Sequence, residues 1–488
     1  MKKTFLLSCL MLAAMPVMAA YTGHVYVDKN KNGVFDQSEK PLAGIKVSDG
    51  LNVVETAADG SFTLPGHERE RFIFITTPSG YKTFNRHYHK IEKKQSGYDF
   101  GLIPYSGRIR KDGSHRYIHI TDTEIFNTEN HADWVNNVRD YARNEQAAFI
   151  IHTGDICYEK GLKAHIKLMN TENMDCPVFY CIGNHDLVKG KYGEELFESI
   201  YGPVYYSFDA GNVHYVVTPM SGGDHAPGYT SDDVCRWLKN DLAHIRPGTP
   251  VVVFNHDLLT YEDTFIFKSK NAGSINLNEY NLKAWVYGHW HINYMKKQGD
   301  VYSVCTSSLD KGGIDHSTTA FRVMHVDSKG DFTSELRYTY LDKNICIASP
   351  AGVMASGVLP VAVNVYSSVS PVREVLYTCL ADGKPVLKNK RLLQSTDWSW
   401  NGELPLSHKY VGKELTLRVT ARFNNGEIAE AESNFICRTE KTVPLFSADW
   451  DNLSGNAKHS APVSAPLNLP LQLAWTNNVG ADRKSTRL

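Results

Sequence analysis

The chain has 488 residues, of which 42% are apolar and 11% aromatic, and its formal net charge at pH 7 is −1. This length predicts several domains. The near-neutral charge, without a long basic run, excludes a general electrostatic attraction to nucleic acid or anionic membranes. After the N-terminal segment, no apolar stretch approaches the roughly 18 residues that a membrane span requires.

The first 19 residues have the composition of a secretory signal peptide. Lys2 and Lys3 precede an apolar run from Phe5 to Met15, and Val17 to Ala19 offer small or tolerated residues at a cleavage site. We therefore expect residues 1–19 to be removed and the mature protein to be periplasmic, secreted or on the cell surface. The later cysteines are scattered, lie mostly in apolar runs and form no Cys-x-x-Cys pair, which favours buried thiols over a cysteine-based zinc site.

Residues 20–108 predict a small β-sandwich, because short strand patterns such as "GHVYVD" and "RFIFITTP" alternate with turn signals and helical periodicity is missing. Inside this segment, "DKNKNGVFDQSE" (residues 28–39) has the spacing of an acidic calcium loop, with Gly33 at the turn. The candidate calcium ligands are Asp28, Asn30, Asn32, Asp36 and Glu39. The alternative is a polar hairpin loop that binds no ion.

The pattern changes over residues 112–345, where apolar strand-like runs alternate with helical segments, as in "RYIHITD", "HADWVNNVRDYARNEQ" and "AFIIHTGD". This alternation predicts an α/β layered domain whose strands are buried on both faces. Residues 350–440 return to short strands with the turn spacing of an immunoglobulin-like sandwich. The expected fold is therefore a multidomain chain in which a central α/β sandwich is flanked by two small all-β sandwich domains.

The last part of the chain differs from everything before it. Residues 441–481 are rich in Pro, Ser and Asn and predict a linker, and its final "LQLAWTNNVGA" resembles the entry to a quinoprotein-type β-propeller, so we expect the start of a truncated further domain. Residues 482–488, "DRKSTRL", resemble the translation of a sequencing adapter rather than natural protein. The alternative for these seven residues is an ordinary basic tail.

Polar residues of the same kinds follow the strands of the α/β segment. They are Asp122 after "IHIT", Asp155 after "FIIHTG", Asn184, His185 and Asp186 after "FYCIG", His256 after "VVVFN", and His289 and His291 in "GHWH". One Asp or Asn after a strand is often only a turn former. Because the carboxyl ends of strands in open α/β sheets line the functional crevice, five instances in one domain predict a site of oxygen and nitrogen ligands.

The motifs "GDICY", "GNHD", "VVFNH" and "GHWH", in this order after "TD", resemble the motif series of the calcineurin-like metallophosphoesterases. The flanking sandwiches resemble the accessory domains of a bacterial exported branch of that family. The resemblance implies two metal ions (iron, manganese or zinc) that share Asp155. It implies Asp122 and His291 on the first ion, and Asn184, His256 and His289 on the second. It also implies that His185, held by Asp186, lies near the leaving oxygen without binding metal.

The first motif departs from the family pattern, because Asp122-Thr123-Glu124 stands where Asp-x-His is usual. Glu124 is one candidate for the missing ligand. Tyr158 is the other, since a similar Gly-Asp-x-x-Tyr motif occurs in purple acid phosphatases; the third possibility is that neither residue binds. An anionic oxygen ligand at this position makes the site harder and favours iron or manganese over zinc.

The expected reaction is hydrolysis of a phosphate mono- or diester, including nucleotides, by a hydroxide that two metal ions share. Two cations about 3.5–4 Å apart neutralise the phosphoryl oxygens, lower the pKa of a bridging water and align its attack. The alternative is a surface interaction or glycan-binding protein with a vestigial metal site, for which Glu124 is the only support. Beyond a possible nucleotide substrate, no nucleic-acid partner is expected.

Overall fold

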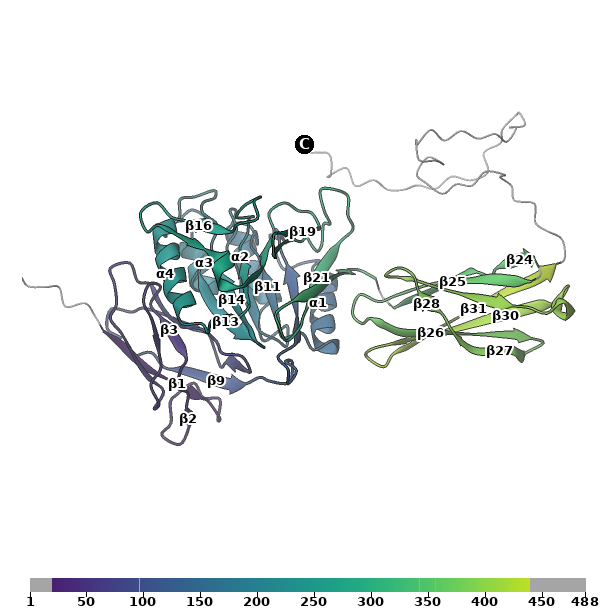
Figure 1. Cartoon of the computed structure of the whole chain (residues 1–488), viewed down its shortest axis with the longest axis horizontal. Helices are drawn as coiled ribbons and strands as arrows, with labels where there is room; N and C mark the ends of the chain where they lie inside the picture. The colour runs from purple at the N-terminus through teal and green to yellow at the C-terminus, as the bar shows by residue number, and fades with distance from the viewer. Residues whose placement is uncertain (1–19, 96, 342, 356, 439–488) are drawn as a thin grey trace, which may run out of the picture. The chain divides into compact units, whose positions relative to one another are not determined.

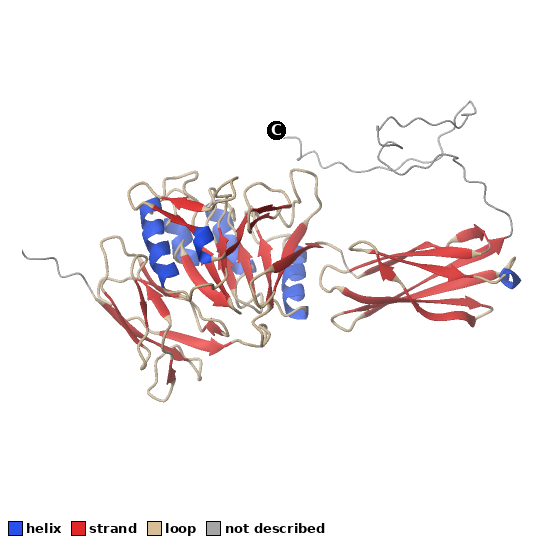
Figure 2. Cartoon of the chain, viewed as in Figure 1, coloured by secondary structure: helices blue, strands red, loops and turns tan. Residues whose placement is uncertain are grey.

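The structure is a computed structural model that describes residues 20–95, 97–341, 343–355 and 357–438. It divides into two compact units, one ending at Tyr340 and one beginning at Leu341 (Figures 1 and 2). The predicted signal peptide, linker, propeller-like segment and adapter-like tail lie outside the described residues. The predicted fold class is confirmed: two β-sandwiches accompany an α/β sandwich. No described helix is long and apolar enough to cross a membrane.

The N-terminal part of the first unit is a sandwich of two sheets (Figure 1). One sheet has the order β2-β1-β9-β7, with β5 also paired to β1, and the other has the order β4-β3-β6-β8. Their strands are β1 (Tyr21–Val27), β2 (Lys40–Pro41), β3 (Lys46–Ser48), β4 (Val53–Glu55), β5 (Ser61–Leu64), β6 (Phe72–Ile75), β7 (Tyr81–Thr83), β8 (Tyr88–Lys90) and β9 (Phe100–Pro104).

The α/β part contains two further sheets. The first has the order β12-β11-β10-β21-β22 and the second β13-β14-β15-β18-β20-β19. The first sheet consists of β10 (His115–Ile120), β11 (Phe149–His152), β12 (Val178–Tyr180), β21 (Ala320–Val326) and β22 (Phe332–Tyr338). The second consists of β13 (Tyr206–Ala210), β14 (Val213–Val217), β15 (Val251–Phe254), β18 (Leu282–Tyr287), β19 (Tyr294–Gln298) and β20 (Val301–Cys305). The hairpin β16 (Ile266–Lys268) and β17 (Ser274–Asn276) and the 3-10 turn η1 (Leu277–Tyr280) precede β18.

Four helices accompany these sheets, namely α1 (Ala132–Asn144), α2 (Tyr158–Leu168), α3 (Glu195–Tyr201) and α4 (Ser231–Ala243). Helix α1 buries Trp134, Val138 and Tyr141, which recur at helical spacing on one face. Helix α4 begins at a capping box in which Thr230 and Asp233 satisfy each other's backbone N–H groups. Between the sheets, a core of aromatic and β-branched residues excludes water, as the apolar strand patterns predict.

Strand β6 joins the N-terminal sandwich to the α/β part, because its two faces pack into two different hydrophobic cores. Along β6, Ile73 packs into the core of the sandwich, whereas Phe72 and Phe74, on the opposite face of the strand, pack into the α/β core. Arg71 adds ion pairs to Glu194 at 2.8 Å and Glu198 at 2.9 Å. The N-terminal sandwich is therefore packed against the α/β part and is not a separate body on a linker.

The second unit is a β-sandwich with sheets β23-β25-β29-β28 and β24-β31-β30-β26-β27. Its elements are β23 (Asn344–Ser349), β24 (Gly352–Ala355), β25 (Val358–Tyr366), β26 (Val372–Ala381), β27 (Lys384–Arg391), β28 (Leu393–Gln394), β29 (Ser399–Pro405), η2 (His408–Tyr410), β30 (Glu414–Phe423) and β31 (Ile428–Arg438). Alternate residues of β25, β26 and β30 are buried in its core, which is the period-2 pattern of a two-layer sandwich. Seven of the eight cysteines in the described residues are buried, as expected for packed thiols.

Candidate metal centre

Polar side chains from both α/β sheets meet at the ends of their parallel strands. His291 Nε2, beyond β18 of the second sheet, lies 3.2 Å from Asp122 Oδ1, beyond β10 of the first. His256 Nε2, beyond β15, lies 3.1 Å from Asp155 Oδ2, beyond β11. The two sheets therefore join at this edge and bring residues more than 100 positions apart within hydrogen-bond distance.

Asp155 lies at the centre of this group. One of its oxygens belongs to a set with His256 and His289 in which all ligand atoms lie within 4.8 Å of one another. Asp155 also belongs to a second set of three residues, with Glu124 and Cys157, whose ligand atoms again lie within 4.8 Å of one another. A carboxylate shared by two ligand sets can serve two ions at once. This is the position that the sequence motifs assign to Asp155.

Three buried atoms at this edge make no hydrogen bond: Asp122 Oδ1, Asn184 Oδ1 and His256 Nε2. The proton of His256 is on Nδ1, since Nδ1 lies 2.8 Å from the carbonyl oxygen of Thr153, which can only accept. Nδ1 is thus occupied, and Nε2 is the nitrogen that can offer a lone pair to a metal ion, as in histidines that bind metal. Buried polar atoms without partners are costly unless a ligand satisfies them. The donor set consequently fits metal ions of the transition series.

Negative charge accumulates here. Burial lowers the pKa of His256, but the adjacent Asp155 carboxylate outweighs that effect and raises the pKa to about 9. The Asp122 carboxylate, 3.2 Å from His291 Nε2, likewise raises the pKa of His291 above its ordinary value. In both cases a neighbouring carboxylate favours positive charge at the imidazole. A bound cation would supply the same compensation.

The structure separates the two candidates for the irregular first motif by their surroundings. Glu124 Oε1 lies 3.7 Å from His291 Nε2, and Glu124 Oε2 pairs with Lys311 Nζ at 2.9 Å. Tyr158 is 43% exposed, and its ring packs against the rings of Phe126 and His185. Glu124 therefore lies among the ligand atoms, whereas the described contacts of Tyr158 are with the rings beside the site.

The sequence analysis did not select Cys157, which is buried and shares a ligand set with Glu124 and Asp155. Cys157 could have been selected from the sequence, because it is the fourth residue of the "GDICY" motif. Burial and the nearby carboxylates of Asp186 and Asp155 raise the pKa of its thiol, which keeps the sulfur protonated in the absence of a metal.

The expected partner of His185 is corrected by the structure. The Nδ1 atom of His185 lies 2.9 Å from Asp224 Oδ2, so Asp224 and not Asp186 orients the ring. Asp186 is fully buried and accepts hydrogen bonds at 2.9 Å from the backbone N–H groups of Asp155, Cys157 and Gly183. Its carboxylate thus joins the loops after β11 and β12. Asp224 could not be selected from motif spacing because it lies 39 residues from His185.

Backbone strain is concentrated at the same place. Seven non-glycine residues in or beside the site have φ between 44° and 75°: Asp122, Glu124, Asp155, Cys157, Tyr158, His289 and His291. Such conformations cost of order 1–3 kcal/mol each and persist where the surroundings impose them. The motif glycine Gly183 has a different constraint, since a Cβ there would lie 2.2 Å from Asp155 Oδ1. Only glycine lets that backbone approach the carboxylate.

The predicted calcium loop closes on itself. Asp28 accepts N–H groups from Asn32 at 3.1 Å and Gly33 at 3.0 Å, and Glu39 accepts those of Lys29 and Asp36. Asn30 Nδ2 donates to Asp36 Oδ2 at 2.7 Å. Asp28 and Glu39, the first and twelfth residues of the motif, therefore both bind the backbone of the same loop. However, Asp28, Asp36 and Glu39 are not among the sets of three ligand atoms within 4.8 Å that the described residues form.

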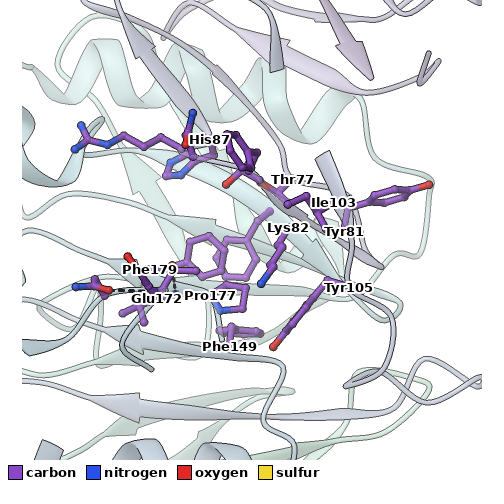
Figure 3. A pocket seen from close by; sticks show the side chains of 18 of the residues that line it. Thr77, Tyr81, Lys82, His87, Ile103, Tyr105, Phe149, Glu172, Pro177 and Phe179 are labelled. Carbon is purple, nitrogen blue, oxygen red and sulfur yellow. Dashed lines mark hydrogen bonds between the residues drawn. The ribbon is translucent and has the colours of Figure 1, made fainter. Parts of the chain in front are cut away.

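A large cavity of about 820 Å³ lies elsewhere, between β7 of the N-terminal sandwich and the start of β12 (Figure 3). Tyr81 and Tyr105 line it from the sandwich, and Phe149, Pro177 and Phe179 line it from the α/β part. None of the predicted metal ligands contributes to it. The candidate site is therefore the cluster at the strand ends and not this larger cavity.

Comparison with known proteins gives matches over the same regions. A sequence model described as "Calcineurin-like phosphoesterase" matches residues 115–293, and one described as the N terminal of calcineurin-like phosphoesterase matches residues 29–104. Purple acid phosphatase 13 of Arabidopsis thaliana is 26% identical over 215 residues, which is 41% of this chain and 36% of that protein. The match thus spans little more than a third of the relative's length.

Two solved structures are also similar in part. A predicted phosphoesterase from Streptococcus pneumoniae shares 12% identity over 46% of this chain and 98% of its own, with a TM-score of 0.23. Wild-type Vps29 complexed with zinc from Entamoeba histolytica shares 10% identity over 45% of this chain and 97% of its own, with a TM-score of 0.24. At these TM-scores neither structure carries an argument about this chain.

The contacts of Asp186 generate a prediction. Asp186→Asn replaces one acceptor oxygen with a donor, so at least one buried N–H group loses its partner, at a cost of about 1–3 kcal/mol. We expect a lower urea midpoint and fewer metal ions per chain by mass spectrometry, because the Asp155 loop loosens. Asp224→Asn, which changes a partly exposed carboxylate, is the control and should leave the unfolding free energy unchanged. Wild-type stability and metal content in Asp186→Asn would contradict this role.

Proposed function

The chain belongs to the calcineurin-like phosphoesterase family, whose two sequence models together cover just over half of it, and we propose that it hydrolyses phosphate mono- or diesters with a binuclear metal centre. The observation that carries this proposal is the group of three buried, unpartnered ligand atoms around a carboxylate shared by two ligand sets. Buried polar atoms that lack hydrogen-bond partners destabilise a fold unless a ligand satisfies them.

The proposed ligand assignment follows the contacts. Asp155 serves both ions, Asn184, His256 and His289 hold one, and Asp122, His291 and Glu124 hold the other. Glu124 is preferred to Tyr158 because its carboxylate lies in a ligand set and near His291. When bound, the ions, which we propose to be iron, manganese or zinc, neutralise the phosphoryl oxygens and activate the attacking water.

The remaining chemistry belongs to His185. Burial lowers the pKa of His185, but its hydrogen bond to Asp224 and the charge of Asp155 outweigh that effect and raise the pKa above its ordinary value. The ring is partly exposed, so it can reach a bound ester. We propose that His185 holds a proton for the leaving oxygen and that Asp224 aligns the imidazole for its transfer.

The alternative, an interaction or glycan-binding protein with a vestigial metal site, is disfavoured. Loss of function would leave some ligand positions replaced, yet Asp155, Asn184, His256 and His289 all retain metal-binding side chains. Glu124 itself remains a competent ligand. We also propose export to the periplasm or cell surface, on the basis of the charged and apolar pattern of residues 1–19, which lie outside the described part of the chain.

The central experiment compares Asp155→Ala with His185→Ala. Asp155→Ala should lose both metal ions, since one carboxylate serves the pair. His185→Ala should keep them but lose about 10²–10⁴-fold in turnover, the usual contribution of a general acid. That loss should shrink for p-nitrophenyl phosphate, whose leaving group hardly needs a proton. Metal analysis and kinetics check both, and a metal-free His185→Ala or a fully active Asp155→Ala would show the roles to be wrong.

The two candidates for the irregular first motif are separated by Glu124→Gln and Tyr158→Phe. We expect Glu124→Gln to reduce the metal content toward one ion per chain, because an anionic ligand becomes a neutral amide. Tyr158→Phe removes only a hydroxyl beside the site and should retain two. The opposite result, or loss of a tyrosinate–iron absorption band in Tyr158→Phe, would assign the position to the tyrosine.

We propose that the loop at residues 28–39 binds a calcium ion. The proposal rests on the closed loop, in which Asp28 and Glu39 both accept backbone N–H groups. Carboxylate oxygens that accept one N–H group still have lone pairs for a hard cation. Isothermal titration of the full chain with calcium should give one site outside the metal centre that Asp28→Ala removes. Asp59→Ala, which changes an exposed aspartate outside the loop, should retain it. Absence of binding heat in the wild type would reject the ion.

A further inference from the structure

Two strongly exposed apolar side chains of the first unit, Tyr261 and Ile314, lie beside the metal centre. Seven large apolar residues are exposed in its described part: Val34, Phe126, Tyr158, Tyr261, Met295, Ile314 and Tyr340. Tyr261 at 73% and Ile314 at 74% are the most exposed, and both line a cavity of about 530 Å³ that also includes His289. Exposed apolar surface beside a polar site marks a place where a ligand is bound.

We call Leu258, Tyr261, Trp290, Ile292 and Ile314 the aromatic platform. Its residues come from the loops after β15 and β18 and from the loop before β21. Trp290 stands between the proposed ligands His289 and His291 in the sequence. A molecule on the platform would therefore lie directly beside the metal centre.

Several contacts fix the Trp290 ring and the backbone of Ile314. Trp290 Nε1 donates to Asp257 Oδ1 at 3.2 Å, and its ring contacts Tyr287 edge-on at 5.1 Å. The Tyr261 ring stacks on Trp290 with centroids 5.9 Å apart and planes 21° apart. On the other flank, the Ile314 N–H donates to the carbonyl of His291 at 2.9 Å. A hydrogen bond and ring contacts hold the Trp290 ring, so ordering this ring on ligand binding costs little side-chain entropy.

The chemistry of the lining selects the ligand. The lining contains one carboxylate, Asp257, whose Oδ1 accepts the N–H groups of Trp290 and Leu258. No Lys or Arg side chain lines the cavity to receive a second anionic group. Two nearly parallel rings with exposed surface offer stacking faces, which a flat ring covers better than a flexible chain or a sugar does.

We propose that the platform stacks against a flat aromatic group of the substrate, as in a nucleoside monophosphate or an aryl phosphate, while the phosphate lies at the metal centre. This rests on the proposed phosphoesterase function and adds the substrate class. The cavity has the volume of a small-molecule site, and the proposed metal ligand His289 is one of its lining residues, so a ring on the platform and a phosphate at the metal centre would be neighbours.

The test compares adenosine 5′-monophosphate with ribose 5-phosphate, which has the same sugar phosphate without the base. In Tyr261→Ala we expect the ratio of their kcat/KM values to fall about 5- to 150-fold, the range that base–aromatic stacking supplies. Tyr340→Ala, another exposed tyrosine outside the platform, should leave the ratio at the wild-type value. Phenyl phosphate tests the simple aryl group, and n-octyl phosphate tests an alkyl chain.

A second readout does not require turnover. Saturation-transfer difference NMR with adenosine should label the base protons in the wild type and in Tyr340→Ala, and not in Tyr261→Ala. An unchanged ratio in active Tyr261→Ala, undiminished transfer in that variant, or a preference for octyl phosphate would overturn the substrate class alone. Failure of the metal-loaded wild type to hydrolyse any of these esters would instead overturn the proposed function, and the substrate assignment with it.

Discussion

The metal centre depends on one buried carboxylate that binds no metal in the proposed assignment. Asp186 accepts three backbone N–H groups, two from the loop after β11 and one from the loop after β12. Burial and the charge of Asp155 raise its pKa to about 7, which shows how much negative charge the fold places here. Three hydrogen bonds and the positive ions of a loaded site are what make that burial tolerable.

Because those loops are tied together, the ligands can occupy strained conformations. Asp122, Asp155, His289 and His291 all have positive φ, and each follows a strand that the hydrophobic core holds rigidly. In these backbone conformations the ligand side chains that follow different strands point toward the same site. The backbone hydrogen bonds of Asp186 and the surrounding core therefore hold the ligand residues in these conformations.

The N-terminal sandwich contributes to this rigidity through contacts far from the ligands. Thr76 Oγ1 lies 2.9 Å from Ser207 Oγ, and Ser207 in turn donates to Asp241, which faces the buried His214. Burial lowers the pKa of His214, but the carboxylates of Asp241 and Asp209 outweigh it and raise the pKa. A polar network of this kind joins the sandwich to β13, β14 and α4, and its groups satisfy one another without solvent.

The sequence alone determined the layered fold class and the identity of the residues that meet at the strand ends. Apolar periodicity is local, and a parallel strand places whatever follows it at one sheet edge, so Asp122, Asp155, Asn184, His256 and His289 could be selected before any contact was known. Tertiary structure alone decided that Asp224 faces His185 while Asp186 holds the backbone, that Cys157 joins the ligand set, and that Tyr261, Trp290 and Ile314 form one surface. Those contacts join loops that are distant in the sequence. Neither motif spacing nor residue type predicts which distant loops pack together, because that depends on the tertiary fold.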